Sequence, residues 1–206
     1  MSTIAQTPPA RPVRSMTAPL NCSIFLTDIA GFGDPRRDDH DRLALRTALL
    51  RVLVESFGEA GLPWRRCRHQ DRGDGLLTVV PPTISTTPLV DPLLPALAAR
   101  LREHNGSADV PLRIRLRCAL HVGPVLADGT GYPSASVIHT TRMLDSRPLR
   151  RALAVPGPDL AAMVSTSVYE TVVRHLCEPA ARDAFRPVRY RAKGVPISSW
   201  LYRGET

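Results

Sequence analysis

Long hydrophobic runs are missing from this sequence. No stretch approaches the roughly 18 uninterrupted apolar residues that a membrane-spanning helix needs, and the first residues lack the apolar core of a signal peptide. We therefore expect a cytoplasmic protein without a membrane segment. The apolar fraction is nevertheless 43% of 206 residues, which is enough to bury one hydrophobic core.

Cysteine is scarce, and its spacing is not that of a zinc site. The four cysteines, Cys22, Cys67, Cys118 and Cys177, are far apart and form no C-x-x-C pair. Three of them lie in apolar stretches, where a reduced thiol behaves as a small buried hydrophobic group. We therefore predict reduced thiols and no zinc centre.

Lysine is nearly absent. Of the 27 basic residues only Lys193 is a lysine, and the arginines are spread along the chain instead of forming one block. The net charge of +8 is typical of proteins that bind a nucleic acid, an acidic lipid surface or a phosphate-rich ligand. No recognised nucleic-acid-binding motif accompanies the charge, so a nucleic-acid partner rests on charge alone, and solvated arginine-rich faces explain the charge better.

The first 20 residues carry four prolines and two arginines among small residues. Such a composition cannot bury a core, and it predicts a disordered leader over residues 1–20. The remaining residues, 21–206, suit a single domain.

Strand and helix patterns alternate along this domain. Strands are expected where β-forming residues run together or alternate, at residues 24–26, 64–69, 76–80, 112–120, 122–126, 163–164, 186–191 and 197–202. Helices are expected at residues 43–57 and 93–103, from Ser134 to Leu144, and from a capping box at Ser167 to Glu170, with a loop at residues 105–109. This order predicts an α+β sandwich with one antiparallel-rich sheet and flanking helices.

The clearest period-two pattern lies at residues 112–120, where apolar residues alternate with Arg113, Arg115 and Arg117. The apolar positions indicate a face that packs on the core. We expect the arginine face to meet solvent or a second chain.

Two carboxylates mark a candidate site. Asp28 follows the apolar run at residues 24–26, and Asp74 lies at the tip of the hairpin expected around residues 71–75. A carboxylate at the end of a buried strand is costly unless a metal ion, a cation or a set of backbone N–H groups compensates it. If the hairpin lies beside the strand, Mg²⁺ or Mn²⁺ would remove the repulsion between the two carboxylates.

Five short motifs follow one another: Ser-Ile-Phe-Leu-Thr-Asp-Ile-Ala-Gly-Phe at residues 23–32, Arg-Gly-Asp-Gly at 72–75, Arg-Cys-Ala-Leu-His-Val-Gly-Pro-Val at 117–125, Val-Ile-His-Thr-Thr-Arg-Met at 137–143 and Ala-Lys-Gly at 192–194. In content and order they resemble class III adenylate and guanylate cyclases. The first two resemble that family's metal-binding motifs. The others resemble its Gly-Ile-His-x-Gly-Pro-Val strand, its Val-Asn-x-Ala-x-Arg-Met helix and its late Val-Lys-Gly. The resemblance covers about residues 22–203 and implies the family's ferredoxin-like α/β sandwich.

The resemblance also implies roles for the matched residues in the first two motifs. Asp28 and Asp74 would hold two Mg²⁺ or Mn²⁺ ions, with the Ile29 carbonyl as a further ligand. The backbone N–H groups of Phe32 and Gly33 would bind the triphosphate of the substrate.

Two basic residues would act on the phosphates. Arg142 would stabilise the transition state while the ribose 3′-hydroxyl displaces pyrophosphate, and Lys193 would hold the terminal phosphates. The resemblance therefore implies conversion of a nucleoside triphosphate into a 3′,5′-cyclic nucleotide and pyrophosphate for signalling.

The chain departs from the family pattern at two kinds of position. Ile138 stands where the family has an asparagine that donates to the transition state, so we expect weak activity unless a register slip lets His139 substitute. Gln70 stands at the position that reads the base, and the second reading position falls near Gly131 or Tyr132. An amide both donates and accepts, so Gln70 leaves purine and pyrimidine substrates equally open.

The resemblance also implies that the protein pairs with a second copy of itself. The family builds each site from two chains, with the metal carboxylates from one and the arginine and lysine from the other, so we expect a head-to-tail homodimer. The alternative function is a cyclase-homology module without turnover that binds a nucleotide or a regulatory protein partner in a regulatory or defence role. Ile138 and Gln70 favour that alternative, whereas the retained carboxylates and Lys193 favour the enzyme.

Overall fold

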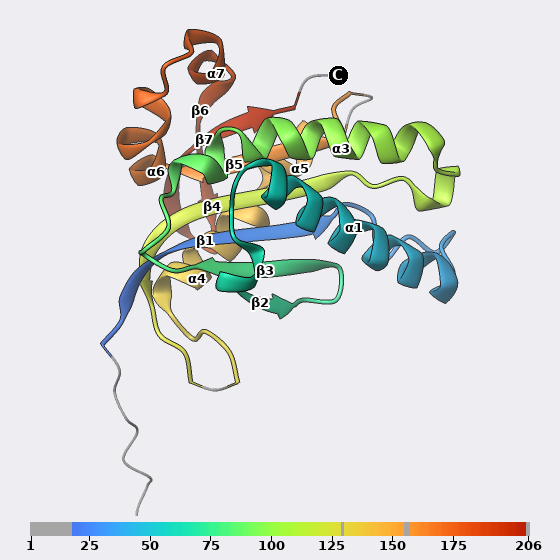
Figure 1. The fold of residues 1–206 in the computed structure, drawn as a ribbon, viewed down its shortest axis with the longest axis horizontal. Helices are drawn as coiled ribbons and strands as arrows, with labels where there is room; N and C mark the ends of the chain where they lie inside the picture. The colour runs from blue at the N-terminus through green and yellow to red at the C-terminus, as the bar shows by residue number, and fades with distance from the viewer. Residues whose placement is uncertain (1–17, 129, 155–156, 205–206) are drawn as a thin grey trace, which may run out of the picture.

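The computed structural model of the protein describes residues 18–128, 130–154 and 157–204, so most of the predicted leader lies outside the described residues. Seven strands form one sheet (Figure 1). They are β1 (Leu20–Ile29), β2 (Arg68–Asp71), β3 (Gly75–Val80), β4 (Leu116–Val125), β5 (Leu160–Ser165), β6 (Phe185–Ala192) and β7 (Val195–Arg203).

Seven α-helices and three short 3-10 helices connect the strands within the described residues. The α-helices are α1 (Asp39–Glu59), α2 (Thr87–Val90), α3 (Leu93–Ser107), α4 (Ala135–Leu144), α5 (Arg147–Ala152), α6 (Thr166–Thr171) and α7 (Pro179–Asp183). The 3-10 helices are η1 (Trp64–Arg66), η2 (Val110–Leu112) and η3 (Val173–His175).

The strand order is β2-β3-β1-β4-β5-β7-β6, and β1 therefore lies inside the sheet between β3 and β4. Among the described strands only β4 and β5 pair in parallel, and the other neighbours are antiparallel. The predicted α+β class with an antiparallel-rich sheet is confirmed.

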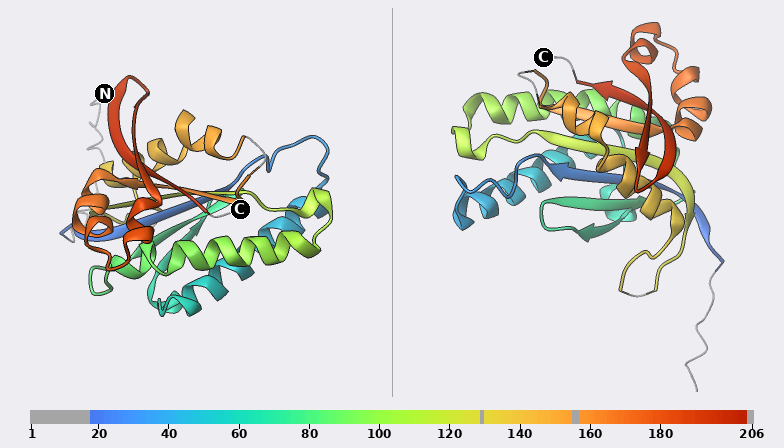
Figure 2. Two further views of the ribbon diagram at one scale, coloured as in Figure 1. Left: turned by 90° about the horizontal axis from the view of Figure 1, so that it is seen from above. Right: turned by 180° about the vertical axis from the view of Figure 1, so that it is seen from behind.

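Helices cover both faces of the sheet. Helices α1 and α3 lie on one face, and α4 and α5 lie on the other (Figure 2). Alternate side chains of β1 divide between the two cores, with Phe25 and Ile29 on the α1 side and Ile24 and Leu26 on the α4 side. Side chains two positions apart on a strand point to the same face, so Asp28 faces the α4 side like Leu26.

The helix predicted at residues 43–57 is confirmed, and it begins earlier because Asp38 caps it. The Asp38 side chain accepts from the Asp41 N–H at 2.8 Å, and the Asp41 carboxylate accepts from the Asp38 N–H at 3.2 Å. This reciprocal pair is a capping box in which aspartate replaces glutamate.

Several local predictions differ from the structure. The strand predicted at residues 64–69 begins only at Arg68, because Trp64 turns in η1 to pack edge-on against Phe57 with ring centroids 5.0 Å apart. The helix after β5 is capped by Ser165, whose hydroxyl accepts from the Val168 N–H, and not by Ser167. The loop predicted at residues 105–109 is helical as far as Ser107.

The strand predicted from residue 112 begins at Leu116, so Arg113 and Arg115 precede it. The reason is the side chain of Asn105, which is buried. Its amide donates to the Ile114 carbonyl at 2.8 Å and its carbonyl accepts from the Ile114 N–H at 2.7 Å. Asn105 thus takes the place of a neighbouring strand for one residue.

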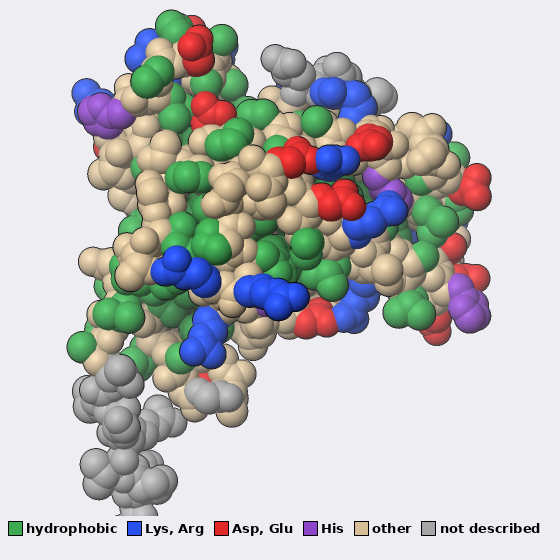
Figure 3. All heavy atoms as spheres, viewed as in Figure 1, with side chains coloured by type: hydrophobic (Ala, Val, Ile, Leu, Met, Phe, Trp, Pro, Cys, Tyr) green, Lys and Arg blue, Asp and Glu red, His purple; other side chains and the backbone are tan. Residues whose placement is uncertain are grey.

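Charges of both signs alternate on the face covered by α1 and α3 (Figure 3). Arg100 on α3 contributes to this mixture, because it pairs with Glu59 on α1 and with Glu103 one turn away at 2.9 Å. This face therefore offers no basic stripe. Among the described helices, none is long and apolar enough to cross a membrane.

We predict that Asn105→Ala lowers the free energy of unfolding by about 2–4 kcal/mol, because it leaves the N–H and carbonyl of Ile114 buried without partners. Urea denaturation followed by circular dichroism measures this. Ser107→Ala, on the exposed end of the same helix, is the control and should cost less than about 0.5 kcal/mol. Equal losses in the two variants would contradict the role given to Asn105.

Candidate active site

Asp28 ends β1 in a buried position, with only 7% of its surface exposed. Its strand neighbours place two residues beside it, Gly75 on β3 and Arg117 on β4. The next residue, Ile29, donates its N–H to the Asp74 carbonyl at 2.8 Å, which fixes the tip of the β2–β3 hairpin against the end of β1. The two predicted carboxylates, Asp28 and Asp74, are therefore brought to one corner.

Gly75 is required at this corner by the close approach of the strands. A Cβ atom on Gly75 would lie 2.9 Å from the Asp28 Cα and would overlap the Thr27 carbonyl. Any larger residue would push the hairpin away from β1 and separate the two carboxylates. The Gly-Asp-Gly sequence is therefore more than a tight turn, because its second glycine sets the distance between the strands.

Arg117 forms an ion pair with the Asp28 carboxylate through Oδ2. Its side chain is only 14% exposed and contacts Asp28, so the prediction that this arginine meets solvent is wrong. Burial raises the pKa of Asp28 to about 6, since the charge of Arg117 offsets the desolvation only in part, and the carboxylates of Asp74 and Asp145 raise it further.

One oxygen of this carboxylate is unsatisfied. Asp28 Oδ1 is buried and has no hydrogen-bond partner among the described residues. A divalent cation that prefers oxygen ligands would satisfy it. The described residues contain no group of three or more His, Cys, Asp or Glu side chains suited to a metal ion, so Asp28 and Asp74 fit an ion that keeps water and a phosphate as its other ligands.

The predicted backbone groups lie in the turn after β1. The Phe32 N–H donates to the Ile29 carbonyl at 3.3 Å, so a predicted phosphate donor and a predicted metal ligand contact each other. The Ile29 carbonyl keeps a second lone pair for another partner. Gly33 follows in the same turn and is exposed.

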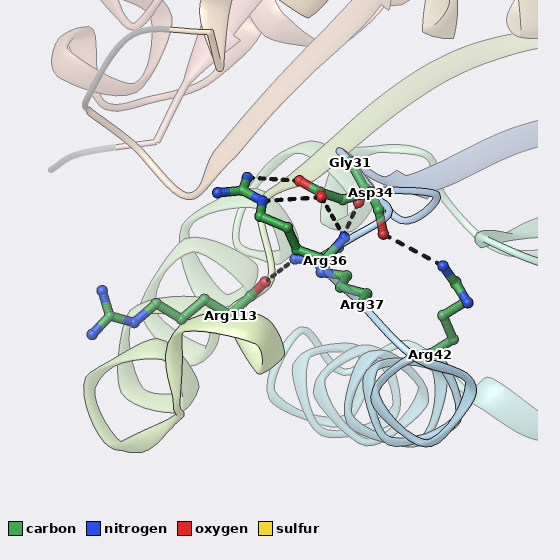
Figure 4. A network of polar contacts seen from close by, with 6 residues as sticks. All are labelled: Gly31, Asp34, Arg36, Arg37, Arg42 and Arg113. Atoms are coloured by element: carbon green, nitrogen blue, oxygen red, sulfur yellow. Dashed lines mark hydrogen bonds and ion pairs between the residues drawn. The ribbon is translucent and has the colours of Figure 1, made fainter.

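Arginines brace this turn (Figure 4). Arg37 donates to the Gly31 carbonyl at 2.8 Å and to the Arg113 carbonyl at 3.1 Å. Arg36 pairs with Asp34 at 2.7 Å and holds the pKa of that carboxyl well below its usual range. The turn that carries the two predicted phosphate-binding amides is therefore held in place by side chains on both sides.

Arg142 and Lys193 line a cavity of about 510 Å³ between α4, the start of α5 and the β6–β7 hairpin. Five cations are among its lining residues; they are Arg72, Arg142, Arg147, Arg191 and Lys193. Asp145 lies in the same wall and acts electrostatically on Asp28, so the cavity borders the carboxylate corner. Such a wall suits a ligand with several negative charges.

Lys193 is held in an uncommon backbone conformation. It has a φ of 48° and is followed by Gly194 at 80°, in a two-residue turn that joins the paired residues Ala192 and Val195. Both turn positions need a positive φ, which a lysine adopts only at a cost. The side chain is exposed at the cavity wall.

Ile138 also lines this cavity and is 52% exposed. It lies one helical turn before Arg142, whose Nε is buried and has no hydrogen-bond partner among the described residues. The structure therefore places an apolar side chain where the family pattern has a donor. His139 does not replace it, because its ring packs against His121 with centroids 4.8 Å apart.

The three predicted base-reading residues meet in a second cavity of about 670 Å³, beside β2 and the loop after β4. A Cβ atom on Gly131 would lie 3.2 Å from Gln70 Nε2, so these two residues are close neighbours. Tyr132 lines both cavities and connects them. One chain thus presents a cavity lined by these three residues next to a cationic one.

Sequence reasoning did not identify Arg117, Asp145 and Arg191 as part of this site. Arg191 had a usable signal, since it lies only two residues before Lys193, on the strand that leads into the turn. Arg117 and Asp145 had none, because their nearness to Asp28 depends on strand register and on helix placement.

Comparisons with known proteins give structural matches only. Neither the protein-family models nor the curated proteins contain a match to this sequence. Among solved structures, an adenylate/guanylate cyclase/hydrolase from Silicibacter pomeroyi superposes with a TM-score of 0.63 at 18% identity, over 90% of this chain and 97% of that one.

Two guanylate cyclases give similar results. The guanylyl cyclase Cya2 matches with a TM-score of 0.62 at 16% identity, over 92% of this chain and 96% of that one. The guanylate cyclase domain of RhGC from Catenaria anguillulae, in complex with GTP, matches with a TM-score of 0.59 at 16% identity, over 92% of this chain and 100% of that one. The protein therefore has the fold of adenylate and guanylate cyclase catalytic domains, as the order of its motifs predicts.

Proposed function

We propose that the protein is a divergent class III nucleotidyl cyclase that converts a nucleoside triphosphate into a 3′,5′-cyclic nucleotide and pyrophosphate. One observation carries this proposal. Asp28 is buried with an unsatisfied oxygen beside Asp74, at a corner that borders a cavity lined by five cations. Carboxylates for a metal ion next to cations for phosphates are what this reaction requires.

Each group has a part in the reaction. Asp28 and Asp74 would hold Mg²⁺ or Mn²⁺, which would supply activation of the ribose 3′-hydroxyl and neutralise phosphate charge. The 3′-hydroxyl would lose its proton to solvent, its oxygen would bond to the α-phosphorus, and the bond from that phosphorus to pyrophosphate would break. Arg142 stabilises the negative charge that develops, and Lys193 holds the phosphates that leave.

The nucleotide would span both cavities. The base would lie by Gln70, Gly131 and Tyr132, and the phosphates would lie by Arg142 and Lys193. The neighbour from Catenaria anguillulae binds GTP, which supports a nucleotide of this size as the ligand. The Gln70 amide fits either class of base.

The complete site would form between two chains in a head-to-tail homodimer, as the family resemblance implies. Within one chain, Arg142 and Lys193 line one cavity, whose lining includes neither Asp28 nor Asp74. Asp145 and Arg72, which lies on the hairpin of Asp74, connect this cavity to the carboxylate corner. A partner chain would bring a second set of carboxylates to the cationic cavity.

The second candidate function is a nucleotide-binding module without turnover. The observation that favours it is Ile138, an exposed apolar residue in the cavity wall where a donor is expected. Losing one oriented donor typically costs about 2.7–4 kcal/mol of transition-state stabilisation. A rate reduced by that amount is hard to distinguish from the absence of turnover, so the binding module is the second candidate.

We predict that the purified protein forms a cyclic nucleotide from at least one of ATP, GTP, CTP and UTP with Mn²⁺, and that Asp28→Ala lowers this rate by about 100-fold or more because the metal ligand is lost. Mass spectrometry of the products measures both results. Asp39→Ala, an exposed aspartate at the start of α1, is the control and should keep the rate. No product from concentrated, dimeric protein would favour the binding module.

A mixing experiment tests whether two chains share the site. Asp28→Ala and Arg142→Ala should each be inactive alone, and an equal mixture of them should regain about a quarter of the wild-type rate, since half of the dimers would carry one intact site. Cyclic product per chain is the measurement. If the mixture stays inactive while each variant still binds the other, the site lies within one chain.

Ile138→Asn should increase the rate, because it restores a donor one turn before Arg142. We expect a gain of about tenfold or more in kcat, with little change in stability since Ile138 is half exposed. Ile138→Leu is the matched control and should leave kcat unchanged. Equal rates in all three proteins would mean that this position does not face the reacting atoms.

A further inference from the structure

Arg117 pairs with Asp28, the residue to which the proposed function gives the metal ion. It lies directly opposite Asp28 in the β1–β4 register, and its guanidinium contacts Asp28 Oδ2. Both side chains are largely buried, with 14% and 10% of their surfaces exposed. The pair forms across a ladder inside the sheet, so its position is fixed by the backbone.

The ion pair between Asp28 and Arg117 leaves one hydrogen-bonding atom of each side chain without a partner. Asp28 Oδ1 and Arg117 Nε are both buried, and neither has a hydrogen-bond partner among the described residues. A buried ion pair is stabilising only where further hydrogen bonds satisfy the remaining atoms of both groups. Here each partner keeps one unsatisfied atom, so the arrangement leaves Asp28 able to accept a better cation.

The charges around the pair attract a second cation to the same place. Asp74 and Asp145 lie close enough to Asp28 to raise its pKa, and besides Arg117 only Arg150 opposes them there. Arg150 is exposed and pairs with Asp145 at 3.3 Å. Asp28 and Asp74 thus carry two negative charges, of which the guanidinium of Arg117 balances one.

We propose that Arg117 is an internal counter-ion that competes with the divalent cation for Asp28 and keeps the metal affinity of the free protein low. A cation that takes both oxygens of Asp28 displaces the guanidinium from Oδ2. Arg117 thereby stabilises the metal-free fold and sets the metal concentration at which the site fills. This inference rests on the proposed metal-binding role of Asp28, and it does not require turnover.

Direct Mn²⁺ binding tests the proposal. Free Mn²⁺ is measured by electron paramagnetic resonance during titration of the full chain, without nucleotide, at pH 8, where the Asp28 carboxyl of the wild type is ionised. Arg117→Met should bind Mn²⁺ about tenfold or more tightly than wild type, because the competing charge is gone. Arg189→Met, an exposed arginine on β6, changes the net charge equally and should leave the affinity unchanged.

Two further variants guard against a folding defect. Arg117→Lys keeps a positive charge and should retain the weak wild-type affinity. The double variant Asp28→Asn with Arg117→Met removes both charges, so it should fold as well as wild type and bind no Mn²⁺ at this site. Thermal unfolding gives a second readout, since Mn²⁺ should raise the Tm of Arg117→Met more than that of wild type.

The outcomes separate this proposal from the proposed function. Unchanged or weaker Mn²⁺ binding by a folded Arg117→Met overturns the counter-ion role, even if the wild type forms a cyclic nucleotide. Tighter Mn²⁺ binding by Arg117→Met supports the counter-ion role even if the wild type forms no cyclic nucleotide. In that case the proposed cyclase activity is overturned and the counter-ion role remains.

Discussion

The burial of one carboxylate is the constraint on which the candidate active site depends. Asp28 lies at the end of a strand that is paired on both sides, so the sheet cannot expose it to water. Its charge must therefore be met by something brought to it, and β4 supplies Arg117. Because that compensation is partial, the pKa of Asp28 stays raised and one of its oxygens remains unsatisfied. The corner therefore keeps an unsatisfied carboxylate oxygen, which is the feature on which the proposed cation site rests.

The two faces of the sheet carry different kinds of residue. The α1 and α3 side is a large aliphatic core, whereas the α4 and α5 side carries Asp28, Arg117 and the cationic cavity. Helix α4 approaches β4 closely because Gly123 has no side chain; a Cβ there would lie 3.0 Å from the Cβ of Ser136 on α4. Burial lowers the pKa of His121 to about 4, so its neutral ring packs beside His139 without adding charge near Arg142. The glycine therefore helps to set where the cations of α4 lie.

The departures from the family pattern lie at uncharged positions, Ile138 and Gln70, and not at the charged ones. The residues to which the resemblance gives the charges of the proposed reaction, Asp28, Asp74, Arg142 and Lys193, are all present. Ile138 stands where the family pattern has a donor near Arg142, and Gln70 stands at the position to which that pattern gives base reading. The proposed enzyme would therefore keep the charged groups of the family pattern. Its rate and its base preference would differ from that pattern, since each depends on single oriented hydrogen bonds.

The sequence by itself determined the α+β class and most strands and helices, because hydrophobic periodicity and turn residues act over a few positions. It also placed Asp28 after a strand and Asp74 at a hairpin tip, but the meeting of the two depends on the β1–β3 pairing, which the tertiary structure decided. Only the tertiary structure placed Arg117 on Asp28, since strand register decides that contact across 89 positions. It also moved the start of β4, because the Asn105 side chain lies where a strand would pair. The cationic cavity is likewise a tertiary product: Arg72, Arg142 and Lys193 come from three separate elements, and no local pattern shows that they meet.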